Sequence, residues 1–214
     1  MSYASVWAKN NITKPNAKLY LEKFGHLLKW QNYKENIMDA GCGDGCVTSE
    51  VLYPYVRKHA QKILAVDKLD GMIDYANKHN KIDEIDYQLV DVTDQNKTKG
   101  LANQFRHIFA FHLAQWIPDT NSMDTGYKNF VNWIPQDVKT ERSNICNNSN
   151  RQVLFERIFP KNIYLSNNIG FELNLCDYEK RTYTIENFGE FLRAGLVMYE
   201  HLERIPKELQ DVAG

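Results

Sequence analysis

Residues 36–45 read Asn36-Ile37-Met38-Asp39-Ala40-Gly41-Cys42-Gly43-Asp44-Gly45, and this stretch decides the fold. A short apolar run is stopped by three closely spaced glycines, after which residues 47–57 can continue as a helix until Pro54 limits or kinks it. In this order of strand, loop and helix, glycines let the backbone approach a ligand, and the helix N-terminus offers unpaired N–H groups. We therefore predict a buried strand, a glycine loop and a ligand site at that loop.

The alternation of apolar strands and amphipathic helices continues along the first 130 residues. Strands that alternate with helices at this spacing indicate βαβ units and a parallel sheet. The expected strands are residues 36–40, 62–67, 87–91 and 107–113, and the expected helices are residues 16–30, 47–57 and 70–79. The sequence thus predicts an α/β fold with a doubly wound, mostly parallel, Rossmann-like sheet.

The composition is that of one ordinary globular domain. The chain has 214 residues, 43% of them hydrophobic and 25% charged. Its 26 Lys and Arg residues against 27 Asp and Glu leave a net charge of −1, which gives no positive field to attract nucleic acid or anionic lipid. No uncharged apolar stretch approaches the ~18 residues of a membrane helix, and the first residues lack a leader pattern. We expect a cytoplasmic protein that binds neither nucleic acid nor membrane.

The cysteines predict neither a disulfide framework nor a metal site. The four of them, Cys42, Cys46, Cys146 and Cys176, are too sparse for a framework in a chain of this length. Cys42 and Cys46 are four positions apart, but no second Cys or His pair at ligand spacing completes a zinc site. Free thiols are therefore expected.

The acidic residues around the glycine loop indicate which ligand it holds. Asp39 stands two positions before the first glycine of a G-x-G-x-G pattern, where a carboxylate repels a pyrophosphate but suits a ligand that carries a cation. This favours S-adenosylmethionine over NAD. Asp67, at the end of the second strand, is placed to accept from ribose hydroxyls, and Asp91, at the end of the third, from an adenine amino group. The alternatives are a glycine turn without a ligand, a capping or solvated Asp67, and an Asp91 that only closes a turn.

The end of the fourth strand, residues 111–118, opens at the sheet edge where ligands of open α/β sheets bind. The indole N–H of Trp116 and the amide of Gln115 are hydrogen-bond donors that can hold a carboxylate. Both of them, like His112, can equally be packing or loop residues.

The ordered set of these motifs resembles the class I S-adenosylmethionine-dependent methyltransferases and, among them, the insect juvenile hormone acid O-methyltransferases. The motifs are DAGCGDG at 39–45, LAVDKLDGMIDYA at 64–76, LVDVTD at 89–94 and FHLAQWI at 111–117. The leader LEKFGHLLKW at 21–30 and the tail segments YTIENFGEFL at 183–192 and ERIPKELQD at 203–211 extend the similarity. It covers residues 3–130 well and 169–211 fairly.

The resemblance implies S-adenosylmethionine as cofactor and assigns residues to two groups. The cofactor-binding group comprises Asp39, Gly41, Cys42, Gly43, Asp67, Lys68, Met72, Asp91, Val92 and Phe111. The catalytic group comprises Trp116 and Gln115, which help to place a substrate carboxylate. The implied substrate is a farnesoic or juvenile hormone acid. Its carboxylate is already ionised at neutral pH, so attack on the sulfonium methyl group needs no general base.

Three features depart from the family pattern. Thr13 stands where family members place a Gln near the substrate, and its shorter side chain reaches less far. Neither the fifth strand with its Pro-Gly-Gly turn nor the last strand can be identified, so a shortened sheet is expected. We read residues 1–214 as one domain, with a donor-binding half at 1–130, an irregular loop at 135–152 and a partial substrate-side half at 153–214.

The function predicted from the sequence is methyl transfer to the carboxylate of a small apolar acid. The alternative is a non-catalytic module that binds the methyl donor or a lipid acid without turnover. A nucleic-acid or protein methyltransferase would need a basic groove or a peptide channel, and the near-zero charge gives no support for the groove. The oligomeric state is left open.

Overall fold

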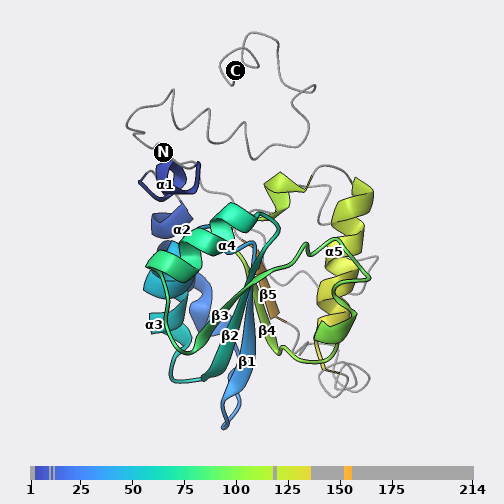
Figure 1. Cartoon of the computed structure of the whole chain (residues 1–214). Helices are drawn as coiled ribbons and strands as arrows, with labels where there is room; N and C mark the ends of the chain where they lie inside the picture. Colours follow the sequence, from blue (N-terminus) through green and yellow to red (C-terminus); the bar gives the residue numbers. More distant parts are fainter. Residues whose placement is uncertain (1–2, 10, 12, 118–119, 136–151, 156–214) are drawn as a thin grey trace.

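A parallel sheet forms the centre of the molecule (Figure 1). The computed structural model describes residues 3–9, 11, 13–117, 120–135 and 152–155. Within these residues five strands pair in the order β3-β2-β1-β4-β5, and all four pairings are parallel. The strands are β1 (Glu35–Ala40), β2 (Ala60–Asp67), β3 (Ile85–Leu89), β4 (His107–Ala110) and β5 (Gln152–Phe155).

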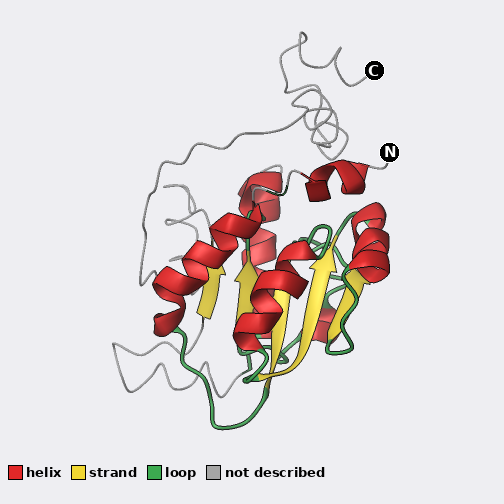
Figure 2. Cartoon of the chain, turned by 90° about the vertical axis from the view of Figure 1, so that its left-hand side faces the viewer, coloured by secondary structure: helices red, strands yellow, loops and turns green. Residues whose placement is uncertain are grey.

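Helices cover both faces of the sheet, with α2, α3 and α4 on one face and α5 on the other (Figures 1 and 2). The helices are α1 (Tyr3–Lys9), α2 (Thr13–Phe24), α3 (Tyr53–Val56), α4 (Asp70–His79) and α5 (Thr120–Trp133). The predicted doubly wound, Rossmann-like α/β fold is therefore confirmed. None of the described helices has the length and apolarity that crossing a bilayer requires.

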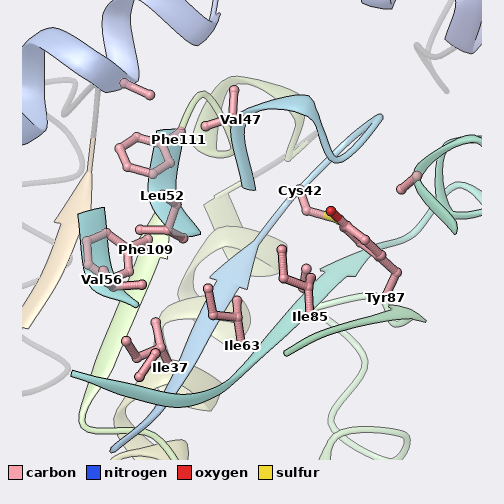
Figure 3. Close-up of a cluster of buried hydrophobic side chains, with 14 of the residues drawn as sticks. Ile37, Cys42, Val47, Leu52, Val56, Ile63, Ile85, Tyr87, Phe109 and Phe111 are labelled. Atoms are coloured by element: carbon pink, nitrogen blue, oxygen red, sulfur yellow. The ribbon is translucent and has the colours of Figure 1, made fainter. Parts of the chain in front are cut away.

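Two apolar cores hold these layers together. On the first face, Ile37, Ile63 and Ile85 of three neighbouring strands lie in register beneath α2, α3 and α4, as Figure 3 shows for the strand residues. On the second face, Phe130 and Trp133 of α5 pack on the opposite side of β1 and β4. Strands buried on both faces explain why their sequences read as continuous apolar runs.

The element boundaries differ from the predicted ones where side chains or backbone geometry end an element. β3 ends at Leu89, because Asp91 closes a turn by accepting from Thr93. β4 ends at Ala110, because His112 adopts a left-handed φ of 55°. The helix predicted at 16–30 is α2, which begins at Thr13 and gives way to a 3₁₀ turn over Gly25–Leu27.

The helix predicted at 47–57 is divided in two. Residues Thr48–Leu52 form a π-helix, and α3 follows with Pro54 in its first turn. Proline lacks a backbone N–H and is tolerated only there, which explains the division.

The expectation that the fifth strand is missing was wrong. Gln152–Phe155 pairs in parallel with β4, from His107 opposite Gln152 to Ala110 opposite Phe155. The strand was overlooked because it is a four-residue run that directly follows a long polar stretch. Gln152 therefore belongs to a strand rather than to the predicted loop, of which residues 136–151 lie outside the described residues. The strands predicted at 170–176 and 181–185 and the helix at 188–202 also lie outside them.

The order of the strands creates a binding crevice. β1 pairs with β2 on one side and with β4 on the other, so the chain reverses its direction of winding between β1 and β4. Ligands of open α/β sheets bind outside the carboxyl ends of the strands at this reversal. The glycine loop follows β1 and therefore lies at that position.

We expect Ile63→Ala to lower the free energy of unfolding by about 2–5 kcal/mol, because it leaves a cavity between two neighbouring strands. Ile63 is fully buried and lies opposite Ile37 and Ile85. Urea unfolding followed by circular dichroism measures the change. The exposed neighbour Lys62 gives the control Lys62→Gln, for which we expect a change within about 0.5 kcal/mol. Equal effects of the two substitutions would contradict the placement of Ile63 in the core.

Candidate functional site

A cavity of about 210 Å³ lies at the carboxyl ends of β1, β2, β3 and β4. Asp39 of β1, Asp67 of β2, Val90 after β3 and Phe111 after β4 all line it. Trp7 of α1, Asn11 before α2 and Thr13 at the start of α2 also line it. The cavity thus combines an edge made by the sheet with a wall made by the N-terminal segment.

The glycine loop is fastened to the end of β2. The amides of Gly41 and Cys42 both donate to the carbonyl oxygen of Val66, at 2.8 and 2.9 Å. The amide of Gly43 donates to Oδ2 of Asp67 at 3.0 Å. These bonds fix the position of the loop relative to the acid that follows it in the site.

Two glycines of the loop serve different purposes. Gly43 and Gly45 have left-handed φ angles of 55° and 77°. A Cβ on Gly45 would come within 2.8 Å of the Cβ of Ala76, whereas a Cβ on Gly43 would meet nothing within 4 Å. Gly45 is therefore needed for packing against α4, and Gly43 leaves open space at the cavity wall.

Asp67 is held by the backbone on both carboxylate oxygens. Oδ1 accepts from the amide of Leu69 and Oδ2 from that of Gly43, each at 3.0 Å. Burial raises the pKa of Asp67, and these backbone hydrogen bonds act in the opposite direction. Each oxygen has a second lone pair, so the carboxylate can also accept hydrogen bonds from a ligand.

Asp39 is a deeply buried acid of the site, with 1% of its surface exposed. The hydroxyl of Thr48 donates to its Oδ2 at 2.6 Å. Burial raises the pKa of Asp39 to about 7, with the hydroxyl lowering it and the charge of Asp67 raising it. This carboxyl group therefore changes its charge near neutral pH.

Asp44 joins the glycine loop to the N-terminal segment. It is 1% exposed and accepts from the amide of Cys46 at 3.0 Å and from Nδ2 of Asn11 at 3.3 and 3.4 Å. Asn11 also starts α2, because its Oδ1 accepts from the amides of Thr13 and Lys14. The ion pair of Lys14 with Glu50 adds a second attachment, to the π-helix.

Aromatic and apolar side chains also line the cavity. Trp116, on the short 3₁₀ helix Ala114–Trp116, meets Trp7 of α1 edge to face, with ring centroids 5.8 Å apart. Leu113 and Ile117 line the cavity beside them. These side chains offer an apolar surface to a ligand and exclude water from that surface.

All ten predicted cofactor-binding residues line this cavity, and so does Trp116. Their roles in binding stay predictions, as does that of Gln115, whose side chain lies outside the described residues. Asp91 closes a turn with Thr93, which confirms one of the interpretations left open. It also lines the cavity, and its role toward an adenine amino group stays a prediction.

The sequence analysis missed Trp7, Asn11 and Asp44, and it considered His112 without selecting it. A signal for Asn11 was present, since asparagine is a preferred N-cap and a helical pattern follows it. Asp44 was passed over as one residue of the glycine loop. Nothing local in the sequence indicates that Trp7 reaches Trp116.

The cysteines of the site are poor nucleophiles. Burial raises the pKa of Cys42 well above its usual range and that of Cys46 to about 12. Sγ of Cys46 donates to Oε1 of Glu50 at 3.2 Å. Among the residues that the structure describes, no group of three or more His, Cys, Asp or Glu side chains could hold a metal ion.

We expect Asp39→Asn to change how stability depends on pH. Between about pH 4 and 7 the carboxyl group of Asp39 is ionised in the unfolded chain but protonated in the folded chain. The free energy of unfolding therefore falls as pH rises through this range. The variant should be about as stable as the wild type near pH 4 and more stable by about 2–4 kcal/mol near pH 8. Urea unfolding at both pH values measures this, with the exposed Asp74→Asn as control. A stability difference that does not vary with pH would contradict the assignment.

Comparisons with known proteins agree with this geometry. A family model described as a methyltransferase domain matches residues 38–124. The juvenile hormone acid O-methyltransferase of Bombyx mori is 29% identical over 135 residues, which are 63% of this chain and 47% of that protein. The chain thus matches about half the length of that relative.

Two solved structures share the fold. The YcgJ protein of Bacillus subtilis has a TM-score of 0.54 at 13% identity, with 92% of this chain and 87% of that chain covered. A putative methyltransferase of Bacillus halodurans C-125 has a TM-score of 0.54 at 12% identity, with coverages of 89% and 87%. At these identities the likeness concerns the fold alone.

Proposed function

Because the chain carries a class I S-adenosylmethionine-dependent methyltransferase domain, we propose that it methylates the carboxylate of a small apolar acid of the farnesoic or juvenile hormone acid type. One observation carries the proposal. The lining of this one cavity contains Asp39, Asp44 and Asp67 beside the glycine loop, which we call its acidic end, and apolar side chains that include Trp7 and Trp116, which we call its apolar end. The first suits a cationic cofactor and the second an apolar substrate.

The acidic end fits S-adenosylmethionine, the cofactor of this domain. Gly43 leaves open space where a ligand can approach the backbone, and Asp67 presents oxygens that ribose hydroxyls can reach. Asp39 and Asp67 supply negative charge for a positively charged ligand. Met72, like Val92, adds an apolar wall suited to an adenine ring. When bound, the cofactor supplies a methyl group activated by the positive charge on sulfur.

The apolar end can align an acid without any proton transfer. A carboxylate is ionised at neutral pH and already nucleophilic, so the protein needs to orient it and remove its water. Trp7 and Trp116, whose rings contact each other, supply apolar surface for it. The Bombyx mori relative, whose name states a carboxylic acid as its substrate, supports this choice.

A non-catalytic module that binds the cofactor without turnover is the second candidate. Thr13 favours it, because this short side chain stands in the cavity wall and presents only a hydroxyl. The two candidates share the acidic end and differ only in turnover, so one pair of measurements separates them.

We expect the purified chain to bind S-adenosylhomocysteine saturably in a calorimetric titration and to transfer labelled methyl from S-adenosylmethionine to farnesoic acid. Asp67→Ala should weaken cofactor binding about tenfold or more, because it removes the ribose acceptor and one anchor of the loop. The exposed Asp86→Ala is the control, and thermal unfolding verifies that each variant is folded. Binding without ester formation would replace the proposal by the non-catalytic module. No binding by a folded wild type would overturn both.

Gly43→Ala and Gly45→Ala should separate binding from stability. We expect Gly43→Ala to weaken S-adenosylhomocysteine binding about tenfold, because the new methyl group takes ligand space, while stability falls by about 1–2 kcal/mol from the left-handed φ. Gly45→Ala should lower stability more, because its Cβ also collides with Ala76. Gly100→Ala, at an exposed position with open space and no left-handed φ, is the control. Equal loss of binding in the first two variants at equal stability would contradict this division.

A further inference from the structure

His112 occupies a distinctive position in the cavity. It follows β4 immediately after the buried Phe111, lines the cavity and has a φ of 55°. A left-handed backbone is uncommon for residues other than glycine, although histidine and asparagine adopt it more often than most. Strained backbone persists where the surrounding structure fixes it, which is frequent at ligand sites.

A buried amide of the N-terminal segment holds the ring of His112. Nδ2 of Asn16, on α2, lies 3.0 Å from Nε2 of His112, and Asn16 is only 5% exposed. An amide nitrogen can only donate, so Nε2 must accept. A neutral imidazole whose Nε2 accepts carries its proton on Nδ1. Asn16 therefore selects the tautomer of His112 that carries its proton at Nδ1.

The charge of the cavity limits where an anionic substrate can bind. Its lining includes four carboxyl groups, those of Asp39, Asp44, Asp67 and Asp91. Of the described residues that line the cavity, Lys68 and His112 are the two whose side chains can carry a positive charge. Lys68 directly follows Asp67 at the cofactor end. A carboxylate that leaves water needs a hydrogen-bond donor in the cavity, because its desolvation cost is otherwise large. His112 follows the end of β4 and lies between the apolar lining residues Phe111 and Leu113.

We propose that His112 binds the carboxylate of the substrate through Nδ1–H and that Asn16 is the positioning residue that fixes its tautomer. This inference rests on the proposed function and deepens it. One carboxylate oxygen accepts from His112, and the other forms the new bond to the methyl carbon as the carbon–sulfur bond breaks and its electron pair returns to sulfur. No proton moves, so His112 remains a donor throughout.

Three substitutions of His112 test the assignment. Asparagine tolerates the left-handed backbone and places an amide nitrogen near the position of Nδ1, whereas glutamine places one near that of Nε2. We expect His112→Ala and His112→Gln to weaken binding of farnesoic acid to the S-adenosylhomocysteine-loaded chain about tenfold or more, and His112→Asn to recover most of this loss. Calorimetry measures the affinity for the acid. The same variants are titrated with S-adenosylhomocysteine alone, and their affinity for it should change by less than about threefold.

Further readouts separate a binding role from a structural one. The hydrocarbon farnesene has no oxygen that could accept from Nδ1–H, so its binding should differ little between the wild type and His112→Gln. Asn16→Ala should raise KM for the acid with little change in kcat, and the exposed His26→Gln is the control. Unchanged acid binding in His112→Gln, or an equal loss for the acid and for farnesene, would overturn the assignment.

The outcome of this test is separate from that of the proposed function. Acid binding that depends on His112 but yields no ester would support the assignment and reject turnover. Failure of the cofactor-loaded wild type to bind the acid would overturn the assignment, even if the cofactor binds normally.

Discussion

The site depends on the bonds that fasten the glycine loop to the end of β2. The amides of Gly41 and Cys42 donate to the carbonyl of Val66, and that of Gly43 donates to Asp67. Because β1 and β2 are paired along their length, these bonds hold the loop in a fixed position relative to the sheet. Asp67 at the end of β2 and the backbone that follows β1 are thus held together, and both line the cavity.

Burial of several acids around this unit has a second effect. Asp39, Asp44 and Asp67 each have a raised pKa, and in each case burial is the main cause. Ionisation of such a buried group without a partner lowers the free energy of unfolding. A cationic ligand bound beside these carboxylates would offset that loss. The hydrogen bonds from Thr48 to Asp39 and from backbone amides to Asp67 lower the pKa values of these acids and so reduce the loss of stability.

The sequence predicted the parts of the structure that depend on local pattern. The strands from β1 to β4 follow from their apolar runs, and the positions of Asp39 and Asp67 follow from their spacing around the glycine loop. β5 was missed, since a four-residue strand is defined by its pairing with β4 and not by its own composition. Trp7 was missed for the same kind of reason, because its contact with Trp116 joins positions more than a hundred residues apart. Tertiary contacts of this kind leave no periodic signal in a single sequence.

The N-terminal segment reaches the cavity without forming any part of the sheet. α1 places Trp7 beside Trp116, α2 places Asn16 against His112, and Asn11 before α2 donates to Asp44 of the glycine loop. Trp7, Asn11 and Thr13 of this segment line the cavity, whereas Ala17 and Leu21 of α2 belong to the core. The ligand preference of the cavity can therefore change through substitutions at these lining positions while the pairing of the strands stays the same.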